Sequence, residues 1–247
     1  MSISTRFGVT STPSGAAETA PVVWEGDAYR LIPSRFPPVS LYETLVAGDR
    51  IAALIEVENL TNPRLRSAER LSASGAAGPA RLQNWNLAPF AYTNPEGSRF
   101  FGPGRPCLEL SGDKQTALAV SVARRQFFLE RTSEPPIGLD MRMLKTPVRG
   151  RFVDLRGLPP DLAEEARREV GNRIPDGVDG ILYRPPERPS ATCIGVLLGS
   201  ALGHSVQATH YRYVWNGRRV SKLYAFDRQG IELHPETLSG PEDVLAA

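Results

Sequence analysis

The alternation of apolar and polar residues predicts where ordered structure starts in this chain. Residues 1–23 are rich in small and polar residues, bury too little to offset the entropy of ordering, and are expected to form a flexible lead. Structure is expected to begin near Trp24. The segment 28–32 then alternates as a strand does, and Pro33 closes it.

Two helices and a loop are predicted to follow this strand. Ser40 can cap a helix over residues 41–48, which Gly48 ends, and apolar residues at helical spacing predict a second helix over 50–59. Residues 67–80 have no usable apolar period, so we expect a long exposed loop there.

The centre of the chain contains a tight turn and a well-marked helix. Residues 97–105 hold three glycines and Pro103, which predicts a sharply turning segment. Over residues 115–131, Leu118, Val122 and Leu129 fall on one face, with alanines between them and bases beyond. This pattern predicts a helix that packs on one side only.

Strand patterns dominate the second half. Alternating or continuous apolar runs of strand length predict four strands, over residues 139–144, 151–155, 180–183 and 192–198. Together with the helices, these strands indicate an α/β fold, a mixed sheet with flanking helices in one domain that spans residues 24–226. No internal repeat divides the chain.

A helix, a hairpin and a tail complete the prediction. Residues 159–171 should form a helix, with prolines at its start, acids near its positive end and Gly171 after its last turn. Asn216-Gly217 between two apolar runs predicts a hairpin over residues 209–226 with a type I′ turn. Residues 227–247 are polar, and we expect a loosely attached C-terminal tail.

Composition narrows the class of protein but not its activity. The 29 basic and 27 acidic residues give a net charge of +2 with no block of like sign, so the chain carries no general footprint for direct nucleic-acid binding. No apolar run is long enough for a membrane helix, and the first residues lack the apolar centre of a secretory signal. A cytoplasmic location is therefore expected, with no association with a membrane.

Few residues offer metal or thiol chemistry. Cys107 and Cys193 are too few for a disulfide framework or a zinc site, and we interpret both as buried thiols. His204 and His210 are six residues apart and are followed by aromatic residues, so no metal site is expected. His210 is better interpreted as a hydrogen-bonded strand residue.

For some charged residues a structural and a functional interpretation are both open, and for others the structural one is simplest. Asp140 and Asp154 lie in predicted strands, where aspartate is disfavoured, so a structural salt link and a cleft position are comparable interpretations. Arg124 and Arg125 are most simply a solvated helix face. Phosphate-binding loops, dinucleotide fingerprints and nucleophile elbows are absent from the sequence.

Taken together, several segments resemble the RES-domain family, which is named for the arginine, glutamate and serine of its active site. They occur in family order over about residues 25–226: YRLIPSRFPPVSLYE, IEVENLTNPRLR, GSRFFGPG, TALA with ARRQFF, LDMRMLKTPVRGRFVDLRG, DGILY and HYRYVWNGRRV. The resemblance implies an ADP-ribosyltransferase-like fold around a cleft for NAD. It further implies a bacterial toxin that degrades NAD or transfers ADP-ribose, and a helix-turn-helix antitoxin-like partner.

Only some of the family's active-site residues are present in this sequence. Its two cleft arginines match Arg30 and Arg99, which the resemblance assigns to phosphate binding. The family tyrosine is replaced by Glu109 and the catalytic glutamate by Val120, and residues 184–187 stand where the family has its serine and a further arginine. A valine cannot stabilise the positive charge that develops on the ribose, and one lost electrostatic group typically lowers the rate by ~10² to 10³.

Three hypotheses follow. The first is a catalytically degenerate protein that keeps an anion- or nucleotide-binding cleft at Arg30 and Arg99. The second is an active enzyme of altered mechanism, acting on NAD or a related nucleotide, in which Glu109 supplies the carboxylate. Alternatively, Glu109 is only a structural partner of Arg99 or Arg105, and the two cleft arginines could serve only in surface salt bridges or helix-end contacts. The third is an interaction-only protein that shields or replaces a toxin through oligomer contacts, with an antitoxin-like protein or a homo-oligomer as the possible partner.

Overall fold

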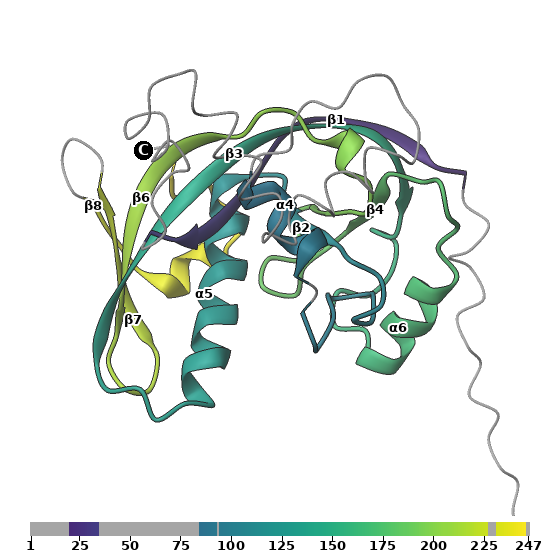
Figure 1. Cartoon of the computed structure of the whole chain (residues 1–247). Coiled ribbons are helices and arrows are strands. Elements are labelled where there is room, and N and C mark those ends of the chain that lie inside the picture. The colour runs from purple at the N-terminus through teal and green to yellow at the C-terminus, as the bar shows by residue number, and fades with distance from the viewer. Residues whose placement is uncertain (1–19, 35–83, 93, 227–230, 246–247) are drawn as a thin grey trace, which may run out of the picture.

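A computed structural model describes residues 20–34, 84–92, 94–226 and 231–245, and these residues form one mixed α/β unit (Figure 1). One sheet holds eight strands in the order β1-β2-β5-β4-β3-β6-β7-β8. The fold class predicted from the sequence is confirmed. The helices predicted over residues 41–48 and 50–59, the loop over 67–80 and most of the N-terminal lead lie outside the described residues.

The strands are β1 (Val22–Pro33), β2 (Leu108–Ser111), β3 (Ile137–Asp154), β4 (Gly180–Tyr183), β5 (Cys193–Val196), β6 (Val206–Trp215), β7 (Val220–Phe226) and β8 (Ile231–Leu233), and the α-helices are α4 (Asn84–Ala91), α5 (Lys114–Glu130) and α6 (Glu164–Asn172).

The longest strand, β3, corrects the prediction of two separate strands at 139–144 and 151–155. One edge of β3 pairs with the whole of β1 along residues 141–152, and the opposite edge pairs first with antiparallel β6 and then with parallel β4. Pro147 lies where that second edge changes partner. Its carbonyl accepts from the Gly203 N–H at 2.8 Å on that edge, so the missing proline N–H removes no bond to β1.

Five of the strands close into a ring. β1 pairs with β2 through Tyr29 and Ser111, β2 with β5, β5 with β4, and β4 with β3, which returns to β1. All five strands contribute to one hydrophobic cluster that includes Ala28, Leu110, Phe152, Leu182 and Ile194. The continuous apolar patterns at 180–183 and 192–198 are explained by this closure, because every residue of β4 and β5 is buried.

Helix α5 matches the helix predicted over residues 115–131. Asp113 caps it by accepting from the Thr116 N–H at 2.8 Å, and Leu118, Val122 and Leu129 pack against β3, β6 and β7. Figure 1 shows α5 beneath the arch formed by β1 and β3, with α6 on the other side of the molecule. Helix α5 also contacts β1 and β2.

The predicted hairpin is confirmed, but its turn type is wrong. β6 and β7 pair from His210–Phe226 to Trp215–Val220, which leaves a four-residue loop over residues 216–219. A type I′ turn needs positive φ at both central residues, whereas only Gly217 has it, at +90°. The Asn216 side chain instead accepts from the N–H groups of Arg218 and Arg219, at 3.0 and 2.9 Å.

Helix α6 is shorter than the predicted helix over 159–171. Pro159 and Pro160 lie in a turn, and the helix begins only at Glu164. Gly171 lies inside the last turn instead of ending it. A Cβ at this position would come within 2.0 Å of the Phe100 carbonyl oxygen, so glycine lets the loop before β2 contact the helix.

The C-terminal segment packs against the domain, which corrects the expectation of a loosely attached tail for residues 231–245. β8 extends the sheet, and Leu238 is buried in the same cluster as α5. The buried Gln115 side chain donates to the carbonyls of Leu238 and Gly240 and accepts from the Val244 N–H. At the other end of the domain, β1 begins at Val22, two residues before the expected start.

No helix in the described part of the chain has both the length and the apolar character needed to cross a membrane.

Candidate ligand-binding cleft

A cleft of about 390 Å³ lies between β1, β2, α5 and the loop that precedes β2. Each element contributes side chains of a different chemical type to the lining of the cleft. β1 contributes Arg30, β2 contributes Glu109, α5 contributes Val120, Arg124 and Arg125, and Tyr183 closes the end of β4. The cleft therefore exists only because the ring of strands brings β1, β2 and β4 together.

The described lining is strongly basic. It contains the side chains of four arginines, Arg30, Arg105, Arg124 and Arg125, and Glu109 is its only carboxylate. Arg105 is already engaged, because its guanidinium donates to the carbonyls of Gly171 and Ile174 at 3.2 and 2.9 Å. Burial and the charge of Arg124 lower the pKa of Arg30 to about 10, and burial also lowers the pKa of Arg125. Both guanidinium groups stay protonated at neutral pH, and a bound anion would relieve their electrostatic cost.

Glu109 is held by three donors. The Arg124 guanidinium donates to Oε2 at 2.5 Å, while the Tyr183 hydroxyl and the Arg99 backbone N–H donate to Oε1 at 3.1 and 3.2 Å. Burial by itself would raise the pKa of Glu109, but the charge of Arg124 and these hydrogen bonds together lower it. The carboxylate is therefore ionised at neutral pH.

Tyr183 provides an aromatic wall next to this carboxylate. Its pKa is raised well above the usual range by burial and by the negative charge of Glu109, so its hydroxyl remains a donor. The guanidinium carbon of Arg99 lies 5.8 Å from the centre of the ring. Tyr183 therefore contacts Glu109 through its hydroxyl and the Arg99 guanidinium through its ring.

The structure brings two of the three residues predicted from the family pattern into the cleft. Arg30 and Glu109 line it, whereas Arg99 is not among its lining residues. The Arg99 side chain donates to the Pro160 carbonyl at 2.9 Å, and only its backbone contacts Glu109. Of the two partners expected for Glu109, Arg99 contributes its backbone N–H, whereas the Arg105 guanidinium donates to the carbonyls of Gly171 and Ile174. The ion pair of Glu109 is formed with Arg124, which was not expected.

Arg124 and Arg125 also correct the interpretation of a solvated helix face. Arg124 is half-exposed, but its guanidinium turns toward Glu109 on β2. Both residues line the cleft because Arg124 lies one turn beyond Val120 and Arg125 one turn beyond Ser121, and these two residues line it as well. Spacing from Val120 was the sequence signal for this, but the partner on β2 was not visible from sequence.

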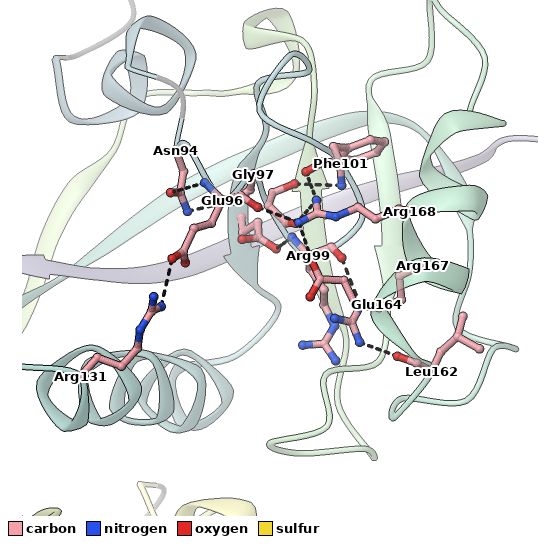
Figure 2. Close-up of polar contacts among 12 residues, drawn as sticks. Asn94, Glu96, Gly97, Arg99, Phe101, Arg131, Leu162, Glu164, Arg167 and Arg168 are labelled. Carbon is pink, nitrogen blue, oxygen red and sulfur yellow. Dashed lines mark hydrogen bonds and ion pairs between the residues drawn. The ribbon is translucent and has the colours of Figure 1, made fainter.

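The loop before β2 is fixed by long side chains from two helices (Figure 2). Arg168 of α6 donates to the carbonyls of Glu96, Ser98 and Phe101, and Arg131 after α5 pairs with Glu96 at 3.0 Å. The tight turn predicted over 97–105 is confirmed at its start, where Gly97 has φ of +76°. The backbone N–H that Arg99 offers to Glu109 is thereby held in place.

A second acid near the cleft was missed by sequence reasoning. Glu187 follows β4, and its charge acts on Arg124. Its Oε2 atom is buried and accepts no hydrogen bond from the described residues. Within residues 20–34, 84–92, 94–226 and 231–245, no group of three or more histidine, cysteine or acidic side chains is arranged to hold a metal ion.

Comparison with known proteins places the chain in a family. The RES domain matches residues 75–216, a range that holds Arg99, Glu109 and Val120 but not Arg30. The chain is also 61% identical over 226 residues to the uncharacterized protein y4oC of Sinorhizobium fredii (strain NBRC 101917 / NGR234). That similarity covers 91% of this chain and 98% of the relative.

Proposed function

Because the chain belongs to the RES-domain family, we propose that it binds a phosphorylated nucleotide of the NAD or ADP-ribose class in this cleft and has little or no power to cleave it. The proposal rests on the residues that line the cleft. Arg30, Arg124 and Arg125 face the cleft, while Val120 stands where the family pattern has its glutamate.

The charge of the lining favours a phosphate-bearing ligand. Glu109 neutralises the guanidinium of Arg124, and Arg30 and Arg125 add two further positive charges to the lining, which can offset the charge of a diphosphate. Guanidinium groups bind phosphate oxygens by paired, charge-assisted hydrogen bonds. Tyr183 and the half-buried Tyr29 add flat apolar surface for a base or a ribose.

The same geometry supports weak catalysis. Cleavage of a nicotinamide–ribose bond requires negative charge close to the sugar in the transition state. Val120 supplies none, and the negative charge of Glu109 is largely cancelled by Arg124 at 2.5 Å. A carboxylate paired in this way is better suited to shape the cleft than to stabilise a forming cation.

Thermal unfolding with added NAD, ADP-ribose or AMP, together with an assay for nicotinamide release, tests both halves of the proposal. We expect the ligands to raise the melting temperature by mass action and nicotinamide release to stay near background. Arg125→Gln should weaken the thermal shift, and Arg218→Gln, on the exposed hairpin loop, should not. The absence of any shift would refute nucleotide binding and favour a role in protein–protein interaction with an antitoxin-like partner or a second copy. Rapid nicotinamide release would refute the loss of catalysis.

A second candidate is an active enzyme in which Glu109 is the catalytic carboxylate. The observation in its favour is that Glu109 is ionised and lines the cleft. In this case a ligand phosphate draws Arg124 away and leaves the carboxylate facing the ribose. Glu109→Gln should then abolish nicotinamide release while the thermal shift with NAD persists. Equal release by the parent and this variant would exclude the candidate.

A further inference from the structure

One face of helix α5 forms a continuous wall of the cleft. The residues of this face recur at the spacing of successive helical turns, and they are Ala117, Val120, Ser121, Arg124, Arg125 and Phe128. Along the wall, small and apolar side chains come first, the two arginines follow, and the aromatic ring of Phe128 comes last. The helix therefore places cationic and aromatic groups next to each other on one side of the cleft.

The Phe128 ring is open to solvent although it belongs to the cleft. Phe128 is 58% exposed, and Tyr92, which follows α4 and also lines the cleft, is 48% exposed. A single exposed apolar residue is common on protein surfaces and needs no explanation. Two open aromatic residues in the lining of one cleft, together with several guanidinium groups, are instead typical of a ligand-binding surface.

The cleft's other two tyrosines, Tyr29 and Tyr183, offer less ring surface. Tyr183 is 3% exposed, because the Phe100 ring packs against it with centroids 5.3 Å apart and the Arg99 guanidinium carbon lies 5.8 Å from its centre. Tyr29 is partly buried against the hydrophobic cluster that contains α5. These two tyrosines suit contact with a ribose or with the edge of a base. A base that stacks face to face needs an open ring, which Phe128 provides.

Helix geometry sets the distance between this ring and the arginines. With a rise of about 1.5 Å per residue, Phe128 lies about 6 Å along the helix axis from Arg124 and about 4.5 Å from Arg125. In a nucleotide, one ribose separates the base from the first phosphate. A phosphate bound at these arginines therefore brings the attached base to the level of Phe128.

We propose that Phe128 is the base-stacking residue of the cleft, so that the cleft prefers a phosphorylated ribose that carries an aromatic base to the same sugar phosphate without one. This inference rests on the proposed function, since it requires the ligand phosphate to lie at the guanidinium groups. Stacking of one base on an aromatic side chain increases affinity roughly 5- to 100-fold, and it tolerates different bases because each has a π-face. Phe128 thus selects for the presence of a base, whereas the arginines select for phosphate.

The neighbouring residue, Phe127, offers a matched control. It is 57% exposed on the same turn of α5, but it is not among the described lining residues of the cleft. Its ring instead contacts Arg131, whose guanidinium carbon lies 5.1 Å from the ring centre. Phe127→Ala and Phe128→Ala therefore each remove an exposed phenyl ring from the same helix, and only the second changes the cleft.

Titration calorimetry with AMP and with ribose 5-phosphate, which lacks the adenine, tests the role of Phe128. The parent protein should bind AMP more tightly than ribose 5-phosphate. Phe128→Ala should weaken AMP binding roughly 5- to 100-fold and leave ribose 5-phosphate binding unchanged, so that the preference for the base is lost. Phe127→Ala should keep both affinities, and Phe128→Trp, which retains an aromatic ring, should keep the preference. Melting temperatures close to that of the parent would show that these variants fold.

Failure of this inference and failure of the proposed function give different results. Arg125→Gln should weaken the binding of both ligands alike, because it removes a charge that faces the phosphate. If the parent binds both ligands without preferring AMP, if Phe128→Ala keeps the preference, or if Phe127→Ala loses it equally, the role of Phe128 is refuted and phosphate binding in the cleft stands. If the parent binds neither ligand, nucleotide binding is refuted, and the role of Phe128 is refuted with it.

Discussion

The ion pair between Glu109 and Arg124 makes a sharp prediction about stability. Arg124→Gln removes the charged donor and leaves Glu109 with two neutral ones, the Tyr183 hydroxyl and the Arg99 N–H. Breaking a fully buried pair destabilises a protein by about 3–5 kcal/mol, and breaking an exposed one by about 0.2–1 kcal/mol. The Glu109 side chain is 12% exposed and that of Arg124 is 52% exposed. Solvent thus screens one partner, and we expect a coupling free energy of about 1–2 kcal/mol.

The assay is a double-mutant cycle by urea unfolding of the parent, Arg124→Gln, Glu109→Gln and the double variant, with Arg218→Gln as a control for loss of a surface charge. At neutral pH, Arg124→Gln should lower the melting temperature by roughly 2–8 °C. The folded-state pKa of Glu109 lies below its ordinary value of 4.5. Its contribution to stability is therefore fully present above about pH 4.5 and is lost as the pH falls through the lower, folded-state value.

The difference in unfolding free energy between the parent and Arg124→Gln should accordingly be constant near neutral pH and shrink on acidification below about pH 4.5. A coupling energy indistinguishable from zero, or a difference that does not change with pH, would refute the assigned role of Arg124.

Three other regions of the fold give further predictions. Gly171→Ala should destabilise the protein by about 1–3 kcal/mol in urea unfolding, because its Cβ would meet the Phe100 carbonyl at 2.0 Å, whereas Gly157→Ala, in open space, should have little effect. Gln115→Ala should speed proteolysis of the C-terminal segment, because it removes the hydrogen bonds that hold residues 238–244, and an unchanged cleavage rate would contradict that anchoring. The Cys193 thiol is buried, with its pKa raised to about 12, so it should react with iodoacetamide only in denaturant; fast labelling of the folded protein would show that burial is not maintained.

Part of the candidate site could be predicted from the chain alone, through the family resemblance. Arg30, Glu109 and Val120 were identified by position along matching segments, and all three line the cleft. Arg124 was missed as a cleft residue, because nothing in a helix pattern shows which strand lies opposite. Arg99 was identified from the same kind of match. Its side-chain direction, however, depends on Pro160, about sixty residues later in the chain.

Local patterns in the sequence determined the helix α5, the β6–β7 hairpin and the buried strands β4 and β5, because each depends on neighbours within a few residues. Only the tertiary structure decided that β3 is one strand, that five strands close into a ring, and that residues 231–245 pack against α5. It also decided that Glu109 meets Arg124. The physical reason is the same in each case: these features are contacts between segments far apart in sequence, and no local periodicity records which distant segment will supply the partner.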